Sequence, residues 1–112
     1  MLGEFEQLVL MALMRLGEDA YGVSVQEEIE RRSGRTVSAG TVYRALLRLE
    51  SKDLVSSWEG EPTPERGGRR KRHYRVLPEG RRVVAESLAV LGRMAEGLGI
   101  VPDLPTTPGG TG

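Results

Sequence analysis

Residues 38–52, with the sequence SAGTVYRALLRLESK, contain the pattern on which the interpretation of the whole chain depends. Ser38 is a favourable helix N-cap, because its hydroxyl accepts a hydrogen bond from a free N–H group of the first turn. Apolar residues then recur at i, i+3, i+4 and i+7, which predicts one buried helix face made of Val42, Ala45, Leu46 and Leu49. The opposite face is polar and basic and carries Thr41, Tyr43, Arg44, Arg48 and Lys52. A helix of this kind fits either the DNA major groove or an ordinary solvated surface, and the flanking sequence distinguishes the two.

Two helices are predicted before this stretch. Residues 4–16, EFEQLVLMALMRL, form an apolar-rich helix that ends at Gly17, and residues 22–32 form a second helix that ends before Gly34. In the second helix the charged side chains are expected to face water: Glu27, Glu28, Glu30, Arg31 and Arg32. Two short helices, a tight turn and a third helix with a polar outer face form a helix-turn-helix arrangement.

The hydrophobic pattern changes its period after the third helix. Residues 54–58 and 72–77 are predicted as strands, and residues 59–71, which hold two prolines and three glycines, are predicted as a mobile loop. A hairpin with a long basic loop directly after a helix-turn-helix is a wing. The predicted fold is therefore mainly α, an α+β winged helix with a three-helix core and a two-stranded wing.

The last predicted helix covers residues 79–98 and has the spacing of a helix–helix seam. Its apolar residues recur at intervals of 4, 3, 4 and 3, at Val84, Leu88, Leu91, Ala95 and Leu98. In the first helix three further apolar residues lie off the main stripe and need a second burying surface: Leu10, Met11 and Met14. We expect these eight residues to form a dimer interface. The alternative is that the last helix packs only on its own domain.

Composition excludes several kinds of site. The 112 residues include no cysteine, which removes disulfides, thiolate metal sites and cysteine nucleophiles, and only one histidine, which disfavours a histidine-rich metal site. We expect neither an enzyme nor a bound cofactor, because the sequence lacks paired carboxylates at a recognisable spacing, a glycine-rich phosphate loop and a nucleophile–base set. No apolar run approaches the length of a membrane span and the first residues do not resemble a signal peptide, which predicts a cytoplasmic protein.

Basic residues are concentrated in the middle of the chain, although the net charge is zero. Six of the 16 basic residues fall between Arg66 and Arg75, in the loop and second strand of the predicted hairpin. By contrast, residues 1–34 hold seven acidic and three basic residues. Positive charge in the wing favours phosphate neutralisation, and the alternative is a solvated loop.

These parts, in this order, resemble the PadR family of bacterial winged-helix transcriptional regulators. The resemblance covers about residues 4–98 and rests on Tyr21-Gly22, Gly40-Thr41-Val42-Tyr43, Leu46, Leu49, Leu54-Val55, Trp58, Arg69–Arg72, Tyr74 and Leu77-Pro78-Glu79-Gly80. The single short C-terminal helix is similar to the smaller of the family's two size classes. The expected organisation is a winged helix-turn-helix DNA-binding domain at residues 1–78, a C-terminal dimerisation helix at 79–98 and a disordered tail at 99–112.

The resemblance implies a homodimer that binds an inverted-repeat operator on double-stranded DNA, usually as a repressor. The third helix would enter the major groove, and the wing would reach the flanking backbone or minor groove. The implied DNA-binding residues are Tyr21, Ser38, Gly40, Thr41, Tyr43, Arg44, Arg48, Lys52, Arg66, Arg69, Arg70, Lys71 and Arg72. Arg44 is the best candidate for a bidentate contact with guanine, and a plain phosphate contact is the equal alternative.

Some relatives in this family bind flat aromatic molecules at the dimer centre through aromatic residues of the final helix. This chain has no aromatic residue after Tyr74. A small hydrophobic effector of this chain would instead meet an aliphatic cavity lined by Phe5, Met11, Met14, Leu91 and Met94. The rival function is a winged-helix module for protein–protein contact, which predicts an apolar or acidic outer face on the third helix and gives no reason for a basic wing.

Overall fold

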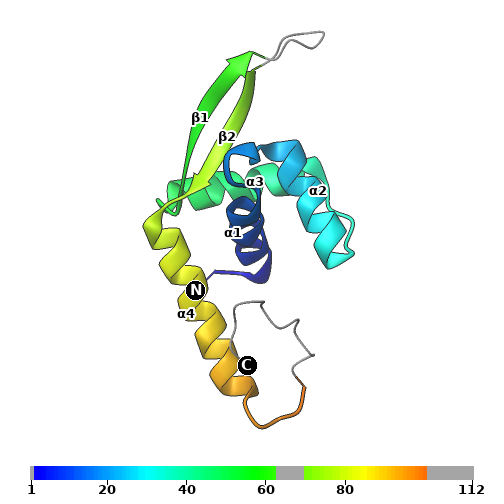
Figure 1. The fold of residues 1–112 in the computed structure, drawn as a ribbon, viewed down its shortest axis with the longest axis vertical. Helices are drawn as coiled ribbons and strands as arrows, with labels where there is room; N and C mark the ends of the chain where they lie inside the picture. Colours follow the sequence, from blue (N-terminus) through cyan, green and yellow to red (C-terminus); the bar gives the residue numbers. More distant parts are fainter. Residues whose placement is uncertain (1, 63–69, 101–112) are drawn as a thin grey trace, which may run out of the picture.

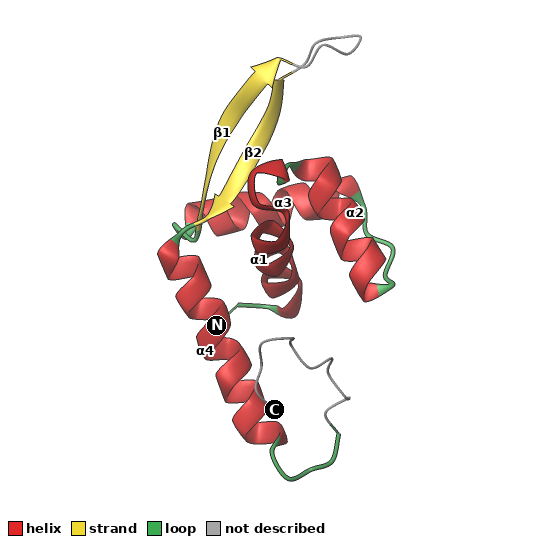
Figure 2. Ribbon diagram, in the orientation of Figure 1, coloured by secondary structure: helices red, strands yellow, loops and turns green. Residues whose placement is uncertain are grey.

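The computed structural model of the chain describes residues 2–62 and 70–100 (Figure 1). They form, in order, α1 (Glu4–Leu16), a 3-10 turn η1 (Gly17–Asp19), α2 (Gly22–Ser33), α3 (Ala39–Ser51), β1 (Val55–Pro62), β2 (Arg70–Val76) and α4 (Pro78–Ala95). The predicted winged-helix fold is confirmed: three helices pack together, and the hairpin and α4 leave this core in opposite directions (Figure 2). Most of the predicted disordered tail, from residue 101 on, lies outside the described residues, as do residues 63–69 of the wing.

Helix α3 begins and packs as its sequence predicts. The Ser38 hydroxyl accepts a hydrogen bond from the Thr41 N–H at 3.1 Å, which satisfies one free donor of the first turn. The four apolar residues at i, i+3, i+4 and i+7 are all buried: Val42, Ala45, Leu46 and Leu49. Because this face is fixed in the core, the opposite face of α3 is directed towards solvent.

The turns between the helices depend on glycines at the helix ends. Gly17 after α1 and Gly34 after α2 have φ values of 58° and 72°, in the left-handed region that residues with a Cβ disfavour. Ser24 supports the start of α2, because its hydroxyl accepts a hydrogen bond from the Tyr21 N–H at 3.0 Å. Helix α1 has the predicted bounds, and α2 extends one residue further than predicted.

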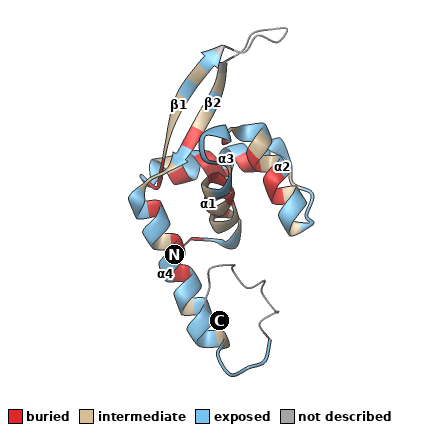
Figure 3. Cartoon of the chain, in the orientation of Figure 1, coloured by how far each residue is buried: buried red, intermediate tan, exposed pale blue. Residues whose placement is uncertain are grey.

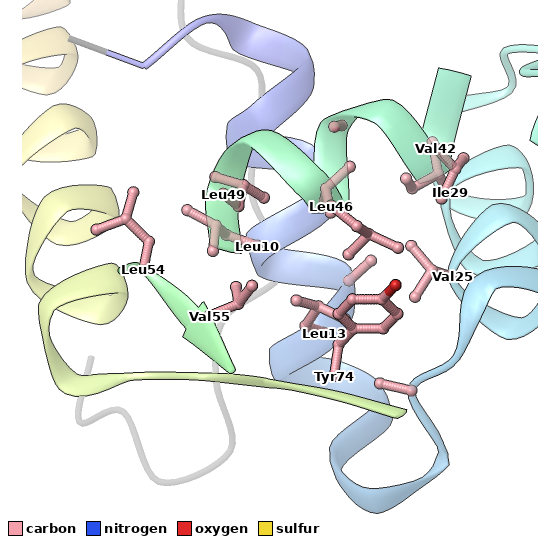
Figure 4. Close-up of a cluster of buried hydrophobic side chains, with 14 of the residues drawn as sticks. Leu10, Leu13, Val25, Ile29, Val42, Leu46, Leu49, Leu54, Val55 and Tyr74 are labelled. Atoms are coloured by element: carbon pink, nitrogen blue, oxygen red, sulfur yellow. The ribbon is translucent and has the colours of Figure 1, made fainter. Parts of the chain in front are cut away.

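The hydrophobic core lies where α1, α2 and α3 meet, and the base of the wing closes it (Figure 4). Its largest fully buried side chains include Leu10, Leu46 and Leu49. Val55 of β1 and Tyr74 of β2 reach the same core from the two strands. The wing is therefore anchored to the helices through apolar side chains as well as through the chain connection.

Three predicted positions need correction. Leu10 and Val84, expected at a dimer interface, are buried in the chain's own core, so neither side chain is available to a second subunit. Glu28, expected to face water, is buried, and its carboxylate accepts hydrogen bonds from Arg31 and Arg32 on the next turn of α2. Leu10 and Val84 are part of the core that several elements of the same chain build, which the hydrophobic pattern of a single helix does not reveal.

The hairpin is antiparallel and is joined to the segment before α2. Trp58 of β1 stands opposite His73 of β2. The Tyr74 N–H donates a hydrogen bond to the Ala20 carbonyl at 2.9 Å, and Tyr21 forms a bridge with His73. Strand β2 consequently lies between β1 and the Ala20–Tyr21 segment, which fixes the wing relative to the start of α2.

The strands extend into residues 59–71, the stretch predicted as a loop. Strand β1 continues to Pro62 and β2 begins at Arg70, with a shift in register between Glu59 and Pro62. Gly60 fits in the strand because the His73 ring packs on it: a Cβ on Gly60 would lie 2.7 Å from the imidazole. Pro62 stands at the end of an edge strand, where the missing N–H costs little.

Helix α4 begins at Pro78, one residue earlier than predicted, and ends at Ala95, three residues earlier. Proline suits the first helical position because no intrahelical partner exists there for an N–H. Gly80 allows α4 to pack against the chain before β1, since a Cβ on Gly80 would lie 2.5 Å from the Leu54 carbonyl oxygen. Beyond Ser87 the helix leaves the core, and most of its surface is exposed (Figure 3).

Candidate nucleic-acid interface

The first two turns of α3 form an exposed polar surface. Ser38, Gly40, Tyr43 and Arg44 are exposed, and Thr41 is half-buried. The Ser38 and Thr41 hydroxyl oxygens lie 2.8 Å apart, and Arg44 Nη2 lies 3.5 Å from Thr41 Oγ1. Donors and acceptors are therefore collected in a small area, which suits contacts with phosphate oxygens and base edges.

The Arg44 guanidinium folds back over the first turn of α3, where Gly40 leaves room for it. A Cβ on Gly40 would lie 3.3 Å from Arg44 Nη1, a tight contact. Within the part of the chain that the structure describes, Arg44 takes part in none of the ion pairs with acidic side chains. Its charge is thus free to meet an anionic partner.

The second half of α3 is tied electrostatically to α1. Arg48 Nε and Lys52 Nζ each lie 3.2 Å from Glu6 Oε2. Glu6 is only 7% exposed and also accepts a hydrogen bond from the Gly3 N–H at 3.4 Å. Burial alone would raise the pKa of Glu6, but the hydrogen bonds from Lys52, Arg48 and the Gly3 N–H outweigh burial and hold the pKa below its ordinary value. The two predicted DNA contacts at this end of α3 therefore already share an anion.

The wing carries its described cations on β2. Lys71 Nζ lies 4.2 Å from the centre of the Tyr21 ring, a cation–π geometry that brings the ammonium close to the start of α2. Arg72 is exposed. Only the backbone of Arg70 is described, as the first residue of β2, and Arg66 and Arg69 lie outside the described residues.

Stacked rings connect the wing with the turn before α2. The His73 ring is stacked on Trp58 with centroids 5.4 Å apart, and it meets Tyr21 edge to face at 5.6 Å. His73 Nδ1 lies 3.0 Å from the Glu18 carbonyl oxygen. The Arg75 guanidinium covers the Trp58 ring at 5.0 Å. These contacts hold the cations of β2 at a fixed place relative to the helices.

Val23 is a candidate functional residue that the sequence pattern does not single out. In the first turn of α2 it is 57% exposed, and it lies with Tyr43 of α3, which is 54% exposed, along a cleft of about 390 Å³. Tyr21 and Tyr74 line the same cleft between α2, α3 and β2. The signal in the sequence is weak: Val23 is an apolar residue two positions before Val25, off the buried face of α2.

The exposed face of α4 is apolar where the sequence predicts a dimer seam. Exposed fractions between 48% and 73% are found for Leu88, Leu91 and Met94 of α4 and for Leu98, which lies beyond its end. Ala95, Met11 and Met14 are half-buried. A groove of about 170 Å³ lies between α1 and α2, lined in part by Leu8, Met11, Ala12 and Ile29. Exposed apolar surface of this kind is typical of an interaction site.

Residues 2–62 and 70–100 contain neither a candidate membrane span nor a candidate metal site. No helix there combines the length and the apolar character that crossing a membrane requires. The same residues bring together no group of three or more potential metal ligands among His, Cys, Asp and Glu. The chemistry of the described surface is that of hydroxyls, cationic groups and exposed apolar side chains.

Residues 9–86 match the sequence profile of a family described as "Transcriptional regulator PadR-like family". The match runs from the middle of α1 into α4, so it includes all of α2 and α3 and both strands of the wing. Among curated proteins, the "Uncharacterized 37.1 kDa protein in transposon TN4556" of Streptomyces fradiae is 37% identical over 102 residues, which is 88% of this chain. The chain spans only 26% of the length of that protein.

Two solved structures are similar in both sequence and fold. A PadR family transcription regulator from hypervirulent Clostridium difficile R20291 is 29% identical with a TM-score of 0.67, and the alignment covers 86% of this chain and 94% of that one. A PadR family transcriptional regulator from Eggerthella lenta DSM 2243 is 31% identical with a TM-score of 0.64, and the alignment covers 86% of this chain and 83% of that one.

Proposed function

Because the chain belongs to the PadR-like family of transcriptional regulators, we propose that it represses transcription as a homodimer bound to an inverted-repeat operator. The coarser conclusion, that it is a DNA-binding transcriptional regulator, follows from the family itself. The DNA contact is supported above all by one observation: the exposed start of α3 collects hydroxyls and a free guanidinium at Ser38, Thr41 and Arg44.

In the proposed complex the first two turns of α3 enter the major groove. The hydroxyls of Ser38 and Thr41 contact phosphates or base edges, and Gly40 allows the helix backbone to approach the DNA closely. Arg44 either reads guanine through a bidentate contact or neutralises a phosphate, and the two roles predict different losses on substitution. Tyr43 offers its hydroxyl to a neighbouring phosphate.

Basic residues on either side of this surface neutralise phosphates in the proposed complex. Those in the wing are Arg66, Arg69, Arg70, Lys71 and Arg72, and the Tyr21 hydroxyl before α2 donates a further hydrogen bond. Arg48 and Lys52 contribute at the far end of α3, where each shares its charge with Glu6. Their attraction for phosphate is therefore weaker than that of an unpaired base.

In the proposed dimer a second copy of the chain covers the apolar face of α4. The exposure of Leu88, Leu91, Met94 and Leu98 supports this arrangement, and Met11 and Met14 of α1 supply the adjoining surface. Residues 1–78 then act as the DNA-binding domain, and residues 79–98, which contain nearly all of α4, as the dimerisation segment. Two-fold symmetry would place the two α3 helices about 34 Å apart, one turn of DNA.

A small hydrophobic effector fits this proposal as a ligand of the dimer. Phe5, Met11 and Met14 from α1, with Leu91 and Met94 from α4, would form an aliphatic and adaptable lining. Such a ligand would relieve repression by changing the distance between the two α3 helices. The protein would act in the cytoplasm, where the chromosomal operator is accessible.

The test begins with selection of a preferred duplex from a random pool by the purified protein. Affinity for the selected operator and for a random duplex is then measured by fluorescence anisotropy. Arg44→Ala should reduce the ratio of the two affinities if it reads guanine, whereas an equal loss on both duplexes assigns it to phosphate. Arg93→Ala, which removes an exposed arginine on α4, is the matched control. A wild-type protein without any sequence preference would refute the proposal in favour of a protein–protein module.

A further inference from the structure

The short connection between α2 and α3 leads directly into the exposed surface of α3. It consists of residues 34–38, and Ser38 is the N-cap of α3. Residues 34–36 of this connection are exposed. Val37 is half-buried, and its side chain packs against the hydrophobic core. The chain is therefore held again at Val37, one residue before the surface that we assign to DNA recognition.

Two side chains of α2 bind the backbone of Val37 from both sides. Gln26 Nε2 donates a hydrogen bond to the Val37 carbonyl at 2.8 Å, and the Val37 N–H donates one to Glu30 Oε2 at 2.9 Å. Gln26 and Glu30 are four residues apart, so their side chains leave the same face of α2 one turn apart. We call this pair of hydrogen bonds the Val37 clamp. Because Val37 belongs to no helix or strand, the clamp supplies the hydrogen bonds that secondary structure would otherwise provide.

Each side chain of the clamp has the chemistry that its partner group requires. A backbone carbonyl needs a donor, which the amide of Gln26 supplies, and a backbone N–H needs an acceptor, which the carboxylate of Glu30 supplies. The Glu30 carboxylate takes part in none of the ion pairs of residues 2–62 and 70–100. Its hydrogen bonding is thus directed to the connection rather than to a basic side chain.

The clamp acts on the peptide group that leads into α3. The carbonyl that Gln26 holds belongs to the peptide group between Val37 and Ser38, and the Ser38 backbone is extended, with φ −85° and ψ 153°. Residues 38–40 are exposed, and the first buried residue of α3 is Val42. The first turn of α3 is therefore held by the core on one side and by the clamp on the other.

A second contact of the connection is more exposed to solvent. Arg35 pairs with Glu4 of α1 through two N···O contacts of 2.9 and 3.2 Å. Both side chains are more than half exposed, so water and salt weaken this pair. By contrast, Gln26 and Glu30 are half-buried, and their bonds reach the backbone itself.

We infer that Gln26 and Glu30 are positioning residues for sequence recognition, because the Val37 clamp fixes the first turn of α3 in the orientation in which its side chains meet base edges. This inference rests on the proposed function. A hydrogen bond to a base edge depends on direction as well as distance, whereas the attraction between a base and a phosphate changes slowly with displacement. Loss of the clamp should therefore reduce discrimination between operator and random DNA more than it reduces affinity for DNA in general.

The test compares Gln26→Leu with Gln7→Leu. Gln7 makes the same kind of bond within the N-terminal segment, from its side-chain amide to the Leu2 carbonyl at 3.2 Å. Gln26→Leu should lower the ratio of operator affinity to random-duplex affinity about tenfold, a loss typical of one mismatched base pair, with little change on the random duplex. Gln7→Leu should leave the ratio unchanged. Thermal unfolding confirms that both variants are folded at the assay temperature.

Substitutions of Glu30 separate positioning from a general loss of packing. Glu30→Gln keeps an acceptor oxygen for the Val37 N–H and should retain most of the ratio, whereas Glu30→Ala should reproduce the effect of Gln26→Leu. Hydrogen exchange at the Val37 amide, followed by NMR without DNA, should be faster in Glu30→Ala than in wild type. Changing each operator base pair in turn should show that Gln26→Leu and Glu30→Ala weaken the preference at several positions.

Three outcomes overturn the inference while the proposed function stands. An equal loss on both duplexes would make Gln26 a phosphate contact, and a preference lost at a single base pair would make it a base contact. An unchanged ratio in either Gln26→Leu or Glu30→Ala would show that α3 keeps its orientation without the clamp. If wild type prefers no duplex at all, the proposed function fails first and this inference fails with it.

Discussion

Glu6→Gln is predicted to weaken the fold and to strengthen DNA binding, two effects of opposite sign from one substitution. The carboxylate of Glu6 accepts hydrogen bonds from Arg48 of α3, from Lys52 at its C-cap and from the Gly3 N–H. It joins the first turn of α1 to the last turns of α3 while it is almost completely buried. Glutamine keeps the shape and one carbonyl oxygen but removes the charge.

The loss of stability follows from the geometry of the pair. An exposed ion pair contributes about 0.2–1 kcal/mol, and a hydrogen bond to a charged group about 1.5–3 kcal/mol. The side chains of Arg48 and Lys52 are 52% and 46% exposed, so solvent screens their share of the interaction. We expect the free energy of unfolding to fall by about 1–2 kcal/mol, with a Tm lower by about 4–8 °C for each kcal/mol.

The pH dependence of this difference has a defined sign. The folded chain holds the pKa of Glu6 below its ordinary value of 4.5, because the cationic hydrogen bonds outweigh burial. The stability that the carboxylate contributes is therefore fully present above pH 4.5 and disappears as the pH falls through the lower, folded-state pKa. Urea unfolding of wild type and Glu6→Gln should give curves that converge in that acid range.

The gain in DNA affinity follows from the release of two bases. Without the carboxylate, Arg48 and Lys52 are free to neutralise phosphates in the proposed complex, which steepens the salt dependence of log K by about 0.9 for each added contact. Fluorescence anisotropy titrations measure this slope between about 50 and 200 mM salt, where the affinity of protein–DNA complexes usually falls steeply. Glu4→Gln is the control, since it removes an equal charge from the same turn of α1 in an exposed pair with Arg35.

Two results would refute this reasoning. An unchanged salt slope would show that Arg48 and Lys52 do not reach phosphate even when they are released. If Glu6→Gln and Glu4→Gln had the same free energy of unfolding, the buried position of Glu6 would add nothing to the stability that its ion pairs with Arg48 and Lys52 provide.

Other substitutions test the packing and the assembly. Gly80→Ala should cost about 1–3 kcal/mol or more in urea unfolding, because its Cβ would meet a backbone carbonyl at 2.5 Å, while Gly92→Ala, with open space around it, should be neutral or stabilising. Leu91→Asp should yield a monomer in light scattering and weaken operator binding, and a stable dimer would place the interface elsewhere. Gly60→Ala should displace the ring stacked on Trp58 and change the fluorescence of this single tryptophan, and an unchanged spectrum would show that the stack adapts.

The helices were predictable because each buries a face against one common core. A spacing of i, i+3, i+4 and i+7 identifies the buried side of α3 from the sequence alone, and burial of all four residues confirms it. End signals were equally local: the hydroxyl of Ser38 begins α3, and Gly17 and Gly34 end α1 and α2. The same helical period leaves the candidate DNA-binding residues at the start of α3 on the opposite, exposed face.

Contacts between distant segments were not predictable from periodicity. Arg48 and Lys52 resemble free bases within their own helix, because their partner Glu6 lies 42 and 46 residues away in the sequence. Leu10 falls off the apolar stripe of α1 and suggests a second subunit, but α1 contacts α2, α3, β2 and α4 within one chain and needs apolar residues on several sides. Gly60 suggests a loop until the His73 ring is seen to pack on it.

The structure separates the part of α3 that sustains the fold from the part that we assign to recognition. Its buried face and its last turns, held by Glu6, carry the packing and the interhelical ion pairs. Residues in its first two turns are mostly exposed, and their side chains bond mainly with one another. Surface changes of this kind usually alter stability by no more than about 0.5 kcal/mol. Except at the Ser38 cap and at the buried Val42, substitutions between residues 38 and 44 are therefore free to change the preferred operator without destabilising the scaffold, whereas substitutions of the buried Ala45, Leu46 and Leu49 are not.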